Sequence, residues 1–160
     1  YVVHFQESAM KPIEISNALQ IHRPETGNLV GVGLYRLFRL VAMEDILGTG
    51  ASAISYYAGK KMGKELHLKK LEEFLALCNE LKIGQIEVPI MTEEKIHVDV
   101  HECVTCSGLS PVGRALCHFE GGLIAGVVEG ILGKHVQAHE ISCIGGLGNK
   151  TCGFELEITS

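Results

Sequence analysis

The stretch CHFEGGLIAGVVEGILGKHVQAHEISCIGGLGNKTCGF, residues 117–154, says most about the fold of this chain. It opens with a long apolar run that ends at Gly133, which is typical of a helix packed against other elements. Two segments of strand character follow, His135–Cys143 and Thr151–Ile158, and the glycine-rich turn 145–149 joins them. The stretch therefore predicts one long helix followed by two antiparallel strands.

The residues before this stretch extend the pattern. Ser110 followed by Pro111 is a helix-start signal and predicts that the long helix runs over 112–132. Alternating β-branched residues predict a hairpin of two more strands over 83–91 and 95–103. Apolar residues at helical spacing predict three earlier helices, over 28–47, 50–66 and 65–82.

These elements together predict an α+β fold, in which a helical N-terminal half precedes an antiparallel sheet with the long helix packed across it. The length of 160 residues suits one domain, residues 1–160. Within it, residues 1–27 predict no more than one short strand near Val2, Val3 and Phe5, with irregular connections.

Composition and charge exclude several classes of function. The 46% hydrophobic and 21% charged residues are typical of a soluble globular protein. The formal net charge of −5 offers no basic surface and argues against direct nucleic-acid binding. No apolar run approaches the roughly 18 residues of a membrane span, and no secretory signal opens the sequence, so we expect a cytoplasmic protein.

Cysteines supply the clearest chemical signal. The chain has 6, and five of them gather in its last third together with Glu140. In a reducing compartment such a cluster favours a metal site over disulfides, and thiolate sulfur with one carboxylate suits zinc. The Cys-x2-Cys pair predicts one ligand set by itself: Cys103, Cys106, Cys143 and Cys152.

Several motifs of the second half resemble the 4-vinyl reductase domain, a small-molecule-binding family related in fold to subunits of the vesicle-tethering (TRAPP) complexes. The motifs are Ala58–Gly63, Glu102-Cys103-Val104-Thr105-Cys106, Cys117 with Glu120-Gly121-Gly122-Leu123, Glu140-Ile141-Ser142-Cys143, and Cys152-Gly153-Phe154. Phenol-sensing relatives hold zinc in such a domain. The resemblance implies that the zinc ligands here are Cys117, Glu140, Cys143 and Cys152.

The two ligand sets make different demands on the fold. Glu140 and Cys143 are three residues apart, so a regular strand would point them to opposite faces. The family-type set therefore requires a bend or bulge near Ser142. Three thiolates and one carboxylate would fill a four-coordinate shell, which favours a structural zinc over a catalytic one.

Candidate pocket residues come from the long helix and the strands. Gly122 and Gly126 recur with Gly130 on one face of the helix, which indicates close packing or the wall of a cavity. Histidines alternate along two strands, and His101 or His139 could hydrogen-bond a ligand. Phenol-sensing relatives also use a tryptophan, which this sequence lacks, so we expect a mostly apolar rather than a phenolic ligand.

We therefore expect a regulatory or sensor domain that binds a small, mostly apolar molecule beside a structural zinc. Relatives of this fold pair through their helices, so the resemblance implies a homodimer with residues 28–47 as the candidate interface. One rival is a reductase-type enzyme or accessory subunit acting on a vinyl-bearing tetrapyrrole, as the family name implies. Another is a scaffold subunit of a larger complex. The sequence has no convincing cofactor motif or acid/base pair, which favours binding over catalysis.

Overall fold

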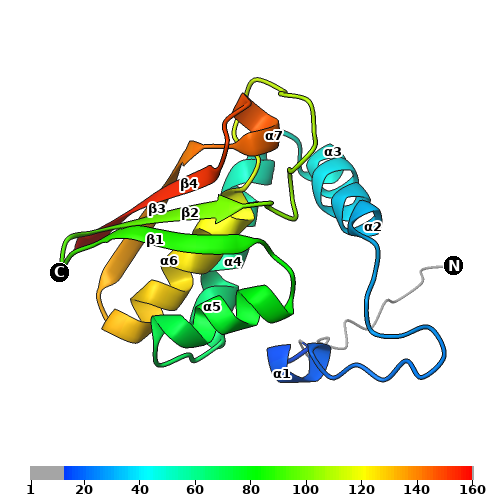
Figure 1. Ribbon diagram of the computed structural model, residues 1–160, viewed down its shortest axis with the longest axis horizontal. Helices are drawn as coiled ribbons and strands as arrows, with labels where there is room; N and C mark the ends of the chain where they lie inside the picture. The colour runs from blue at the N-terminus through cyan, green and yellow to red at the C-terminus, as the bar shows by residue number, and fades with distance from the viewer. Residues whose placement is uncertain (1–12, 160) are drawn as a thin grey trace, which may run out of the picture.

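The computed structural model describes residues 13–159 and confirms the predicted α+β fold (Figure 1). An antiparallel four-stranded sheet has the order β1-β2-β4-β3. Its strands are β1 (Gln85–Met91), β2 (Lys95–His101), β3 (His135–Ser142) and β4 (Cys152–Thr159). The central pair, β2 and β4, carries the alternating buried residues that the hairpin pattern predicts.

Helix α6 (His118–Leu132) lies between the sheet and helix α4 (Ala51–Glu65). A Cβ atom on Gly122 would lie 2.0 Å from the carbonyl oxygen of Tyr56, and one on Gly126 would lie 2.1 Å from that of Lys60. Only glycine permits this approach of two helix backbones. The glycine face of α6 therefore packs directly on α4, as one of the two sequence interpretations expects.

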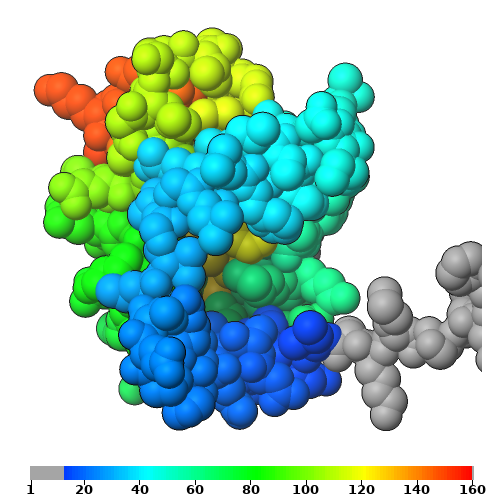
Figure 2. All heavy atoms as spheres, turned by 90° about the vertical axis from the view of Figure 1, so that its right-hand side faces the viewer, coloured from blue at the N-terminus to red at the C-terminus, as the bar shows by residue number. Residues whose placement is uncertain are grey.

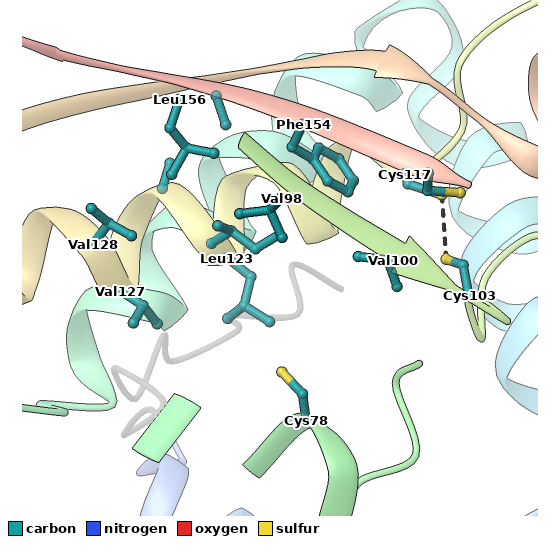
Figure 3. Packing of buried hydrophobic residues seen from close by; sticks show 14 of the residues in the cluster. Cys78, Val98, Val100, Cys103, Cys117, Leu123, Val127, Val128, Phe154 and Leu156 are labelled. Carbon is teal, nitrogen blue, oxygen red and sulfur yellow. Dashed lines mark hydrogen bonds between the residues drawn. The ribbon is translucent and has the colours of Figure 1, made fainter. Parts of the chain in front are cut away.

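The core lies between α6 and the sheet (Figure 3). Val98 and Val100 of β2, with Phe154 and Leu156 of β4, pack toward α6 and are at most 2% exposed. Helix α5 (Leu71–Glu80) closes one side of this core and contributes Cys78, which the sequence assigns to the core. Burial raises the pKa of Cys78 to about 12 and keeps this thiol neutral.

The residues before α4 form a chain of short helices on one side of the molecule (Figure 1). They are α1 (Ile15–Ala18), α2 (Val32–Arg36), the π-helical segment η1 (Leu37–Ala42), α3 (Met43–Leu47) and the 3-10 turn η2 (Gly48–Gly50). The helix predicted over 28–47 thus begins at Val32 and contains a π-helical stretch. Most of its apolar side chains are exposed, Leu37 and Phe38 each at 61%.

Two predicted helix boundaries need correction. The long helix begins at His118 rather than residue 112, because the backbone N–H groups of Val112 and Gly113 instead donate to the carbonyl oxygen of Gly146. The helix predicted over 65–82 is the shorter α5, since His67 has a positive φ of 52° that interrupts the helix before it.

The turn predicted over 145–149 contains a short helix, α7 (Ile144–Leu147). The strand expected near Val2–Phe5 lies outside the described residues. Within residues 13–159, no helix is both long enough and apolar enough to cross a membrane.

Candidate functional site

Five cysteines from four segments meet at one end of α6. Cys103 and Cys106 lie in the turn after β2, which begins at Glu102 with a positive φ of 49°. Cys117 is the N-cap of α6, Cys143 precedes α7, and Cys152 is the first residue of β4. All five are at most 1% exposed. Figure 3 shows the sulfur atoms of Cys103 and Cys117 facing each other, far from Cys78.

The sulfur atoms are spaced as the donors of a tetrahedral metal site are. Cys117 Sγ lies 3.5 Å from Cys106 Sγ, 3.7 Å from Cys152 Sγ and 4.0 Å from Cys143 Sγ. A tetrahedron of sulfur atoms about 2.3 Å from zinc has edges of about 3.8 Å. Two sets of four donors each lie within 4.8 Å of one another. The sets are Cys103, Cys106, Cys117 and Cys152, and Cys117, Glu140, Cys143 and Cys152.

A bulge brings Glu140 to the cluster. The pairing of β3 with β4 shifts between Glu140 and Ser142, as the family-type ligand set requires, and the Gly153 N–H donates to Ser142 Oγ at 2.8 Å. Glu140 Oε2 accepts a hydrogen bond from the Cys117 N–H at 2.9 Å. Within residues 13–159, buried Oε1 has no hydrogen-bond partner. This oxygen is the one expected of a metal ligand, because an unpaired buried acceptor is costly otherwise.

Ionisation in the cluster depends on a cation. Burial and, after it, the neighbouring Cys143 raise the pKa of Glu140 to about 9. Hydrogen bonds with the surrounding thiols, first that with Cys103, and burial raise the pKa of Cys117 above its ordinary range. A divalent ion would reverse both effects, since it favours the anionic form of each ligand. The donor set therefore fits zinc.

Two glycines of α7 let the ligand-bearing loops meet. A Cβ on Gly145 would lie 2.3 Å from the Cys106 carbonyl oxygen, and one on Gly146 would lie 2.1 Å from that of Arg114. The Cys143 N–H donates to Asn149 Oδ1 at 3.0 Å, which closes the loop between Cys143 and Cys152. The loops before and after α6 are thus held together around the thiols.

A cavity of about 780 Å³ lies beside the metal-binding turn, between the N-terminal segment and α6. Leu29 and Val30 line its outer side, and Leu81, Ile83 and Leu123 line its inner side. Figure 2 shows this hollow, where α6 (yellow) is visible between the N-terminal segment (blue to cyan) and α4 (green). The cavity is mostly apolar.

Its polar end is a buried carboxyl group with two hydroxyl partners. Glu120 Oε1 accepts a hydrogen bond from Tyr35 Oη at 3.1 Å and another from Thr105 Oγ1. Glu120 Oε2 is buried, with no partner among residues 13–159. Burial raises the pKa of Glu120, so its carboxyl group is neutral and a proton on Oε2 would be free to bond a ligand.

The comparisons with known proteins agree with this architecture. Residues 96–158 match the family model of the 4-vinyl reductase domain. The chain is 37% identical to the uncharacterized protein MJ1642 of Methanocaldococcus jannaschii over 134 residues, 84% of this chain and 81% of the relative. It is 33% identical to the uncharacterized protein MJ0150 of the same organism over 153 residues, 91% of this chain and 87% of the relative. The chain belongs to the 4-vinyl reductase domain family.

Three solved structures share the fold of this 4-vinyl reductase domain. A vinyl-4-reductase family protein from M. jannaschii has a TM-score of 0.66 at 22% identity, covering 84% of this chain and 85% of its own. The phenol-responsive sensory domain of the transcription activator PoxR with phenol scores 0.66 at 15% identity, covering 82% and 76%. Subunit 3 of a trafficking protein particle complex from Naegleria fowleri, covalently bound to palmitic acid, scores 0.59 at 13%, covering 81% and 95%.

In this 4-vinyl reductase domain the predicted pocket residues lie apart from the cavity. Gly122 and Gly126 contact α4, and the alternation of buried residues along β2 and β3 places His101 and His139 on the sheet face opposite α6. The His101 ring nitrogen instead lies 3.4 Å from Glu87. The structure thus brings together the predicted metal donors, while the four predicted pocket residues are dispersed.

The residues at the polar end of the cavity were missed as site residues. Tyr35 and Glu120 are 85 positions apart, and Thr105 lies between the two cysteines that drew attention to its turn. One local signal existed, because Glu120 is an acidic residue in an otherwise apolar helix segment.

Proposed function

We propose that this 4-vinyl reductase domain is a sensor that binds a small, mostly apolar molecule in the cavity between its N-terminal helices and α6, beside a structural zinc. The observation that carries the proposal is the apolar cavity that ends on the unpartnered Oε2 of Glu120. Few convergent polar groups in an apolar pocket are typical of small-molecule sites. The phenol-bound sensory domain of the same fold supports a ligand-binding role.

The polar end of the cavity favours a ligand with one hydrogen-bond acceptor. Tyr35 and Thr105 both donate to Oε1, so the proton of the neutral Glu120 carboxyl group belongs on Oε2. That group would donate to a carbonyl or hydroxyl oxygen of the ligand. A carboxylate ligand would fit less well, because burying its negative charge here is costly.

The zinc would tie the start of α6 to the sheet. Its family-type ligands are Cys117, Glu140, Cys143 and Cys152, and the spacing of their donor atoms and the bulge at Ser142 support this set. With the shell full, its role would be structural, and such a site contributes on the order of 10 kcal/mol to folding in zinc-dependent peptides.

Signalling would use the N-terminal helices. They line the outer side of the cavity, so a bound ligand would order them, and an attached or partner protein would sense the difference. Their exposed apolar surface also suits a homodimer interface in a cytoplasmic protein.

The cavity is tested with Nile red, a neutral apolar dye with a carbonyl oxygen. We expect saturable binding at one dye per chain, which Val30→Trp weakens at least tenfold because the indole fills the cavity. Val112→Trp is the matched control, since both valines are more than half exposed and Val112 does not line this cavity. Equal binding by the two variants would refute the proposed site.

Native mass spectrometry of the purified chain tests the class of function. A retained small apolar molecule supports the sensor, whereas a nicotinamide- or flavin-sized adduct would favour the enzyme. Elemental analysis of the wild type and of Glu140→Ala and Cys106→Ala then tests the zinc. Metal lost in the Glu140 variant supports the family-type set, and a wild-type protein purified without metal that also refuses added zinc would refute it.

A further inference from the structure

We propose that the cysteine cluster holds two thiophilic divalent ions, with Cys117 and Cys152 bridging them. The second ion would bind Cys103 and Cys106, which the family-type zinc site leaves unused. This inference rests on the proposed zinc site and extends it from one ion to a bridged pair.

The geometry of the shared donors carries the proposal. The two sets of four donors have two members in common, Cys117 and Cys152, whose sulfur atoms lie 3.7 Å apart. That distance matches the edge of about 3.8 Å in a tetrahedral zinc–thiolate site. Two tetrahedra could therefore share this edge, with one ion on each side of it.

Each ion would have its own pair of terminal ligands. Glu140 and Cys143, from the end of β3, would complete the first tetrahedron, and Cys103 and Cys106, from the turn after β2, would complete the second. Cys103 Sγ lies 3.6 Å from Cys117 Sγ, and Cys106 Sγ lies 3.2 Å from Cys152 Sγ. Both terminal cysteines of the second set therefore already contact a bridging thiol.

The charge in the buried cluster also permits the second ion. Three thiolates and a carboxylate around one divalent ion leave two negative charges in excess. Five thiolates and a carboxylate around two such ions leave the same excess, because the second ion displaces one proton from each of Cys103 and Cys106. The added cation thus introduces no further net charge into a site where unpaired charge is costly.

The turn that bears Cys103 and Cys106 is held in place for this role. The Val104 N–H donates to the Ile83 carbonyl oxygen at 2.8 Å, and the Val104 carbonyl oxygen accepts a hydrogen bond from Arg36 Nε at 2.8 Å. The two thiols are therefore presented by an anchored backbone, so that little ordering is required when an ion binds.

Cadmium provides a spectroscopic probe of the pair. The full chain is stripped of metal, reloaded with Cd²⁺ and analysed by native mass spectrometry and cadmium-113 NMR. We expect two ions per chain and two resonances. Cys103→Ser combined with Cys106→Ser should halve the bound cadmium and leave one resonance. Cys78→Ser is the control, because this buried thiol lies outside the cluster.

The outcomes separate the pair from the single site. One ion in the wild type, retained by the double variant, would overturn the second ion and leave the family-type zinc intact. One ion lost in the double variant but kept in Glu140→Gln would overturn both the pair and the family-type ligand set. Acid-labile sulfide in the protein as purified would overturn the pair in favour of an iron–sulfur centre. No cadmium bound at all would refute the proposed metal site itself.

Discussion

Among single residues, Glu120 has the largest effect on what the cavity can recognise. A carboxyl group this deeply buried stays neutral, because burial raises its pKa and the hydroxyl groups of Tyr35 and Thr105 satisfy only one oxygen. Arg39, also buried, lies with its guanidinium carbon 5.7 Å from the centre of the Phe119 ring and so draws η1 toward the start of α6.

Substitution of Glu120 tests its protonation state. A glutamine in its place accepts from both hydroxyl groups and still donates from its amide, so Glu120→Gln should bind Nile red within about threefold of the wild type. Glu120→Leu removes the donor and should weaken binding at least about tenfold. Fluorescence titration measures both. Loss of binding in the glutamine variant alone would show that the carboxyl group is ionised and that the polar end recognises a cation.

Between elements, the contact of α4 with α6 depends on glycine. The faces of both helices lack Cβ atoms where they meet, since a Cβ on Gly59 would lie 2.1 Å from the Phe119 carbonyl oxygen. The cost of these glycines to helix formation is offset by close backbone packing.

Two alanine substitutions in α6 should have opposite effects. Gly122→Ala would place its Cβ against the backbone of α4, so we expect the free energy of unfolding to fall by about 3 kcal/mol or more. Gly130→Ala is the control, because its nearest neighbouring atom lies 3.9 Å away and the position is exposed. There we expect a gain of up to about 1 kcal/mol. Urea denaturation compares the two, and equal effects would refute the packing argument.

The opposite end of the same helix pair is joined by ions. Glu129 of α6 lies 2.8 Å from Lys60 Nζ and 2.8 Å from Lys64 Nζ, both on α4. Burial opposes ionisation of Glu129, but the hydrogen bonds from the two lysines outweigh it and lower its pKa to about 2. The ordinary pKa is 4.5, so the ion pairs stabilise the fold above that value and lose their effect as the pH falls toward about 2.

Replacement of Glu129 should show this pH dependence. We expect Glu129→Gln to lower the free energy of unfolding by about 1–2 kcal/mol at pH 7. The difference from the wild type should shrink as the pH falls through the window from 4.5 to about 2. Glu65→Gln, which removes an exposed pair with Lys61, should change stability by less than about 0.5 kcal/mol. A difference for Glu129→Gln that does not vary with pH would contradict the assignment.

Across the whole molecule, two features join distant parts of the chain. One is the exposed apolar surface of the N-terminal helices, and the other is the turn 103–106. This turn carries metal donors at both ends, while Val104 lines the cavity and Thr105 bonds Glu120 between them. The metal centre and the ligand cavity therefore share one segment.

The shared turn predicts coupling between metal and ligand. Removal of metal with a chelator should weaken Nile red binding by about fivefold or more, because Thr105 loses its fixed position. By linkage, the dye should strengthen metal binding by the same factor. Titrations of the loaded and stripped protein measure both directions. Equal dye affinity in the two states would show that the sites are independent.

The exposed helices predict self-association. Phe38→Glu places a charge in the apolar surface and should convert the expected homodimer to a monomer, as measured by analytical ultracentrifugation. Leu147→Glu is the control, since Leu147 is also exposed but lies on α7. A wild-type protein that is monomeric at high concentration would refute the interface.

Local patterns in the sequence were enough to predict the α+β fold, the two strand pairs, the glycine face of α6 and the gathering of thiols with Glu140. Strand alternation, helical spacing and close cysteine spacing are all set by neighbours in the chain. The family-type ligand set even required the bulge near Ser142, since two ligands three residues apart cannot otherwise share a face.

Tertiary structure was needed to establish where α6 begins, which donors lie within reach of one another and where the cavity ends. The first turn predicted for α6 was lost to backbone hydrogen bonds with Gly146, far along the chain. Tyr35 meets Glu120 only because the N-terminal helices fold back over α6, whereas His139 was directed to the opposite face of the sheet. Contacts between distant segments arise from packing, and no local pattern encodes them.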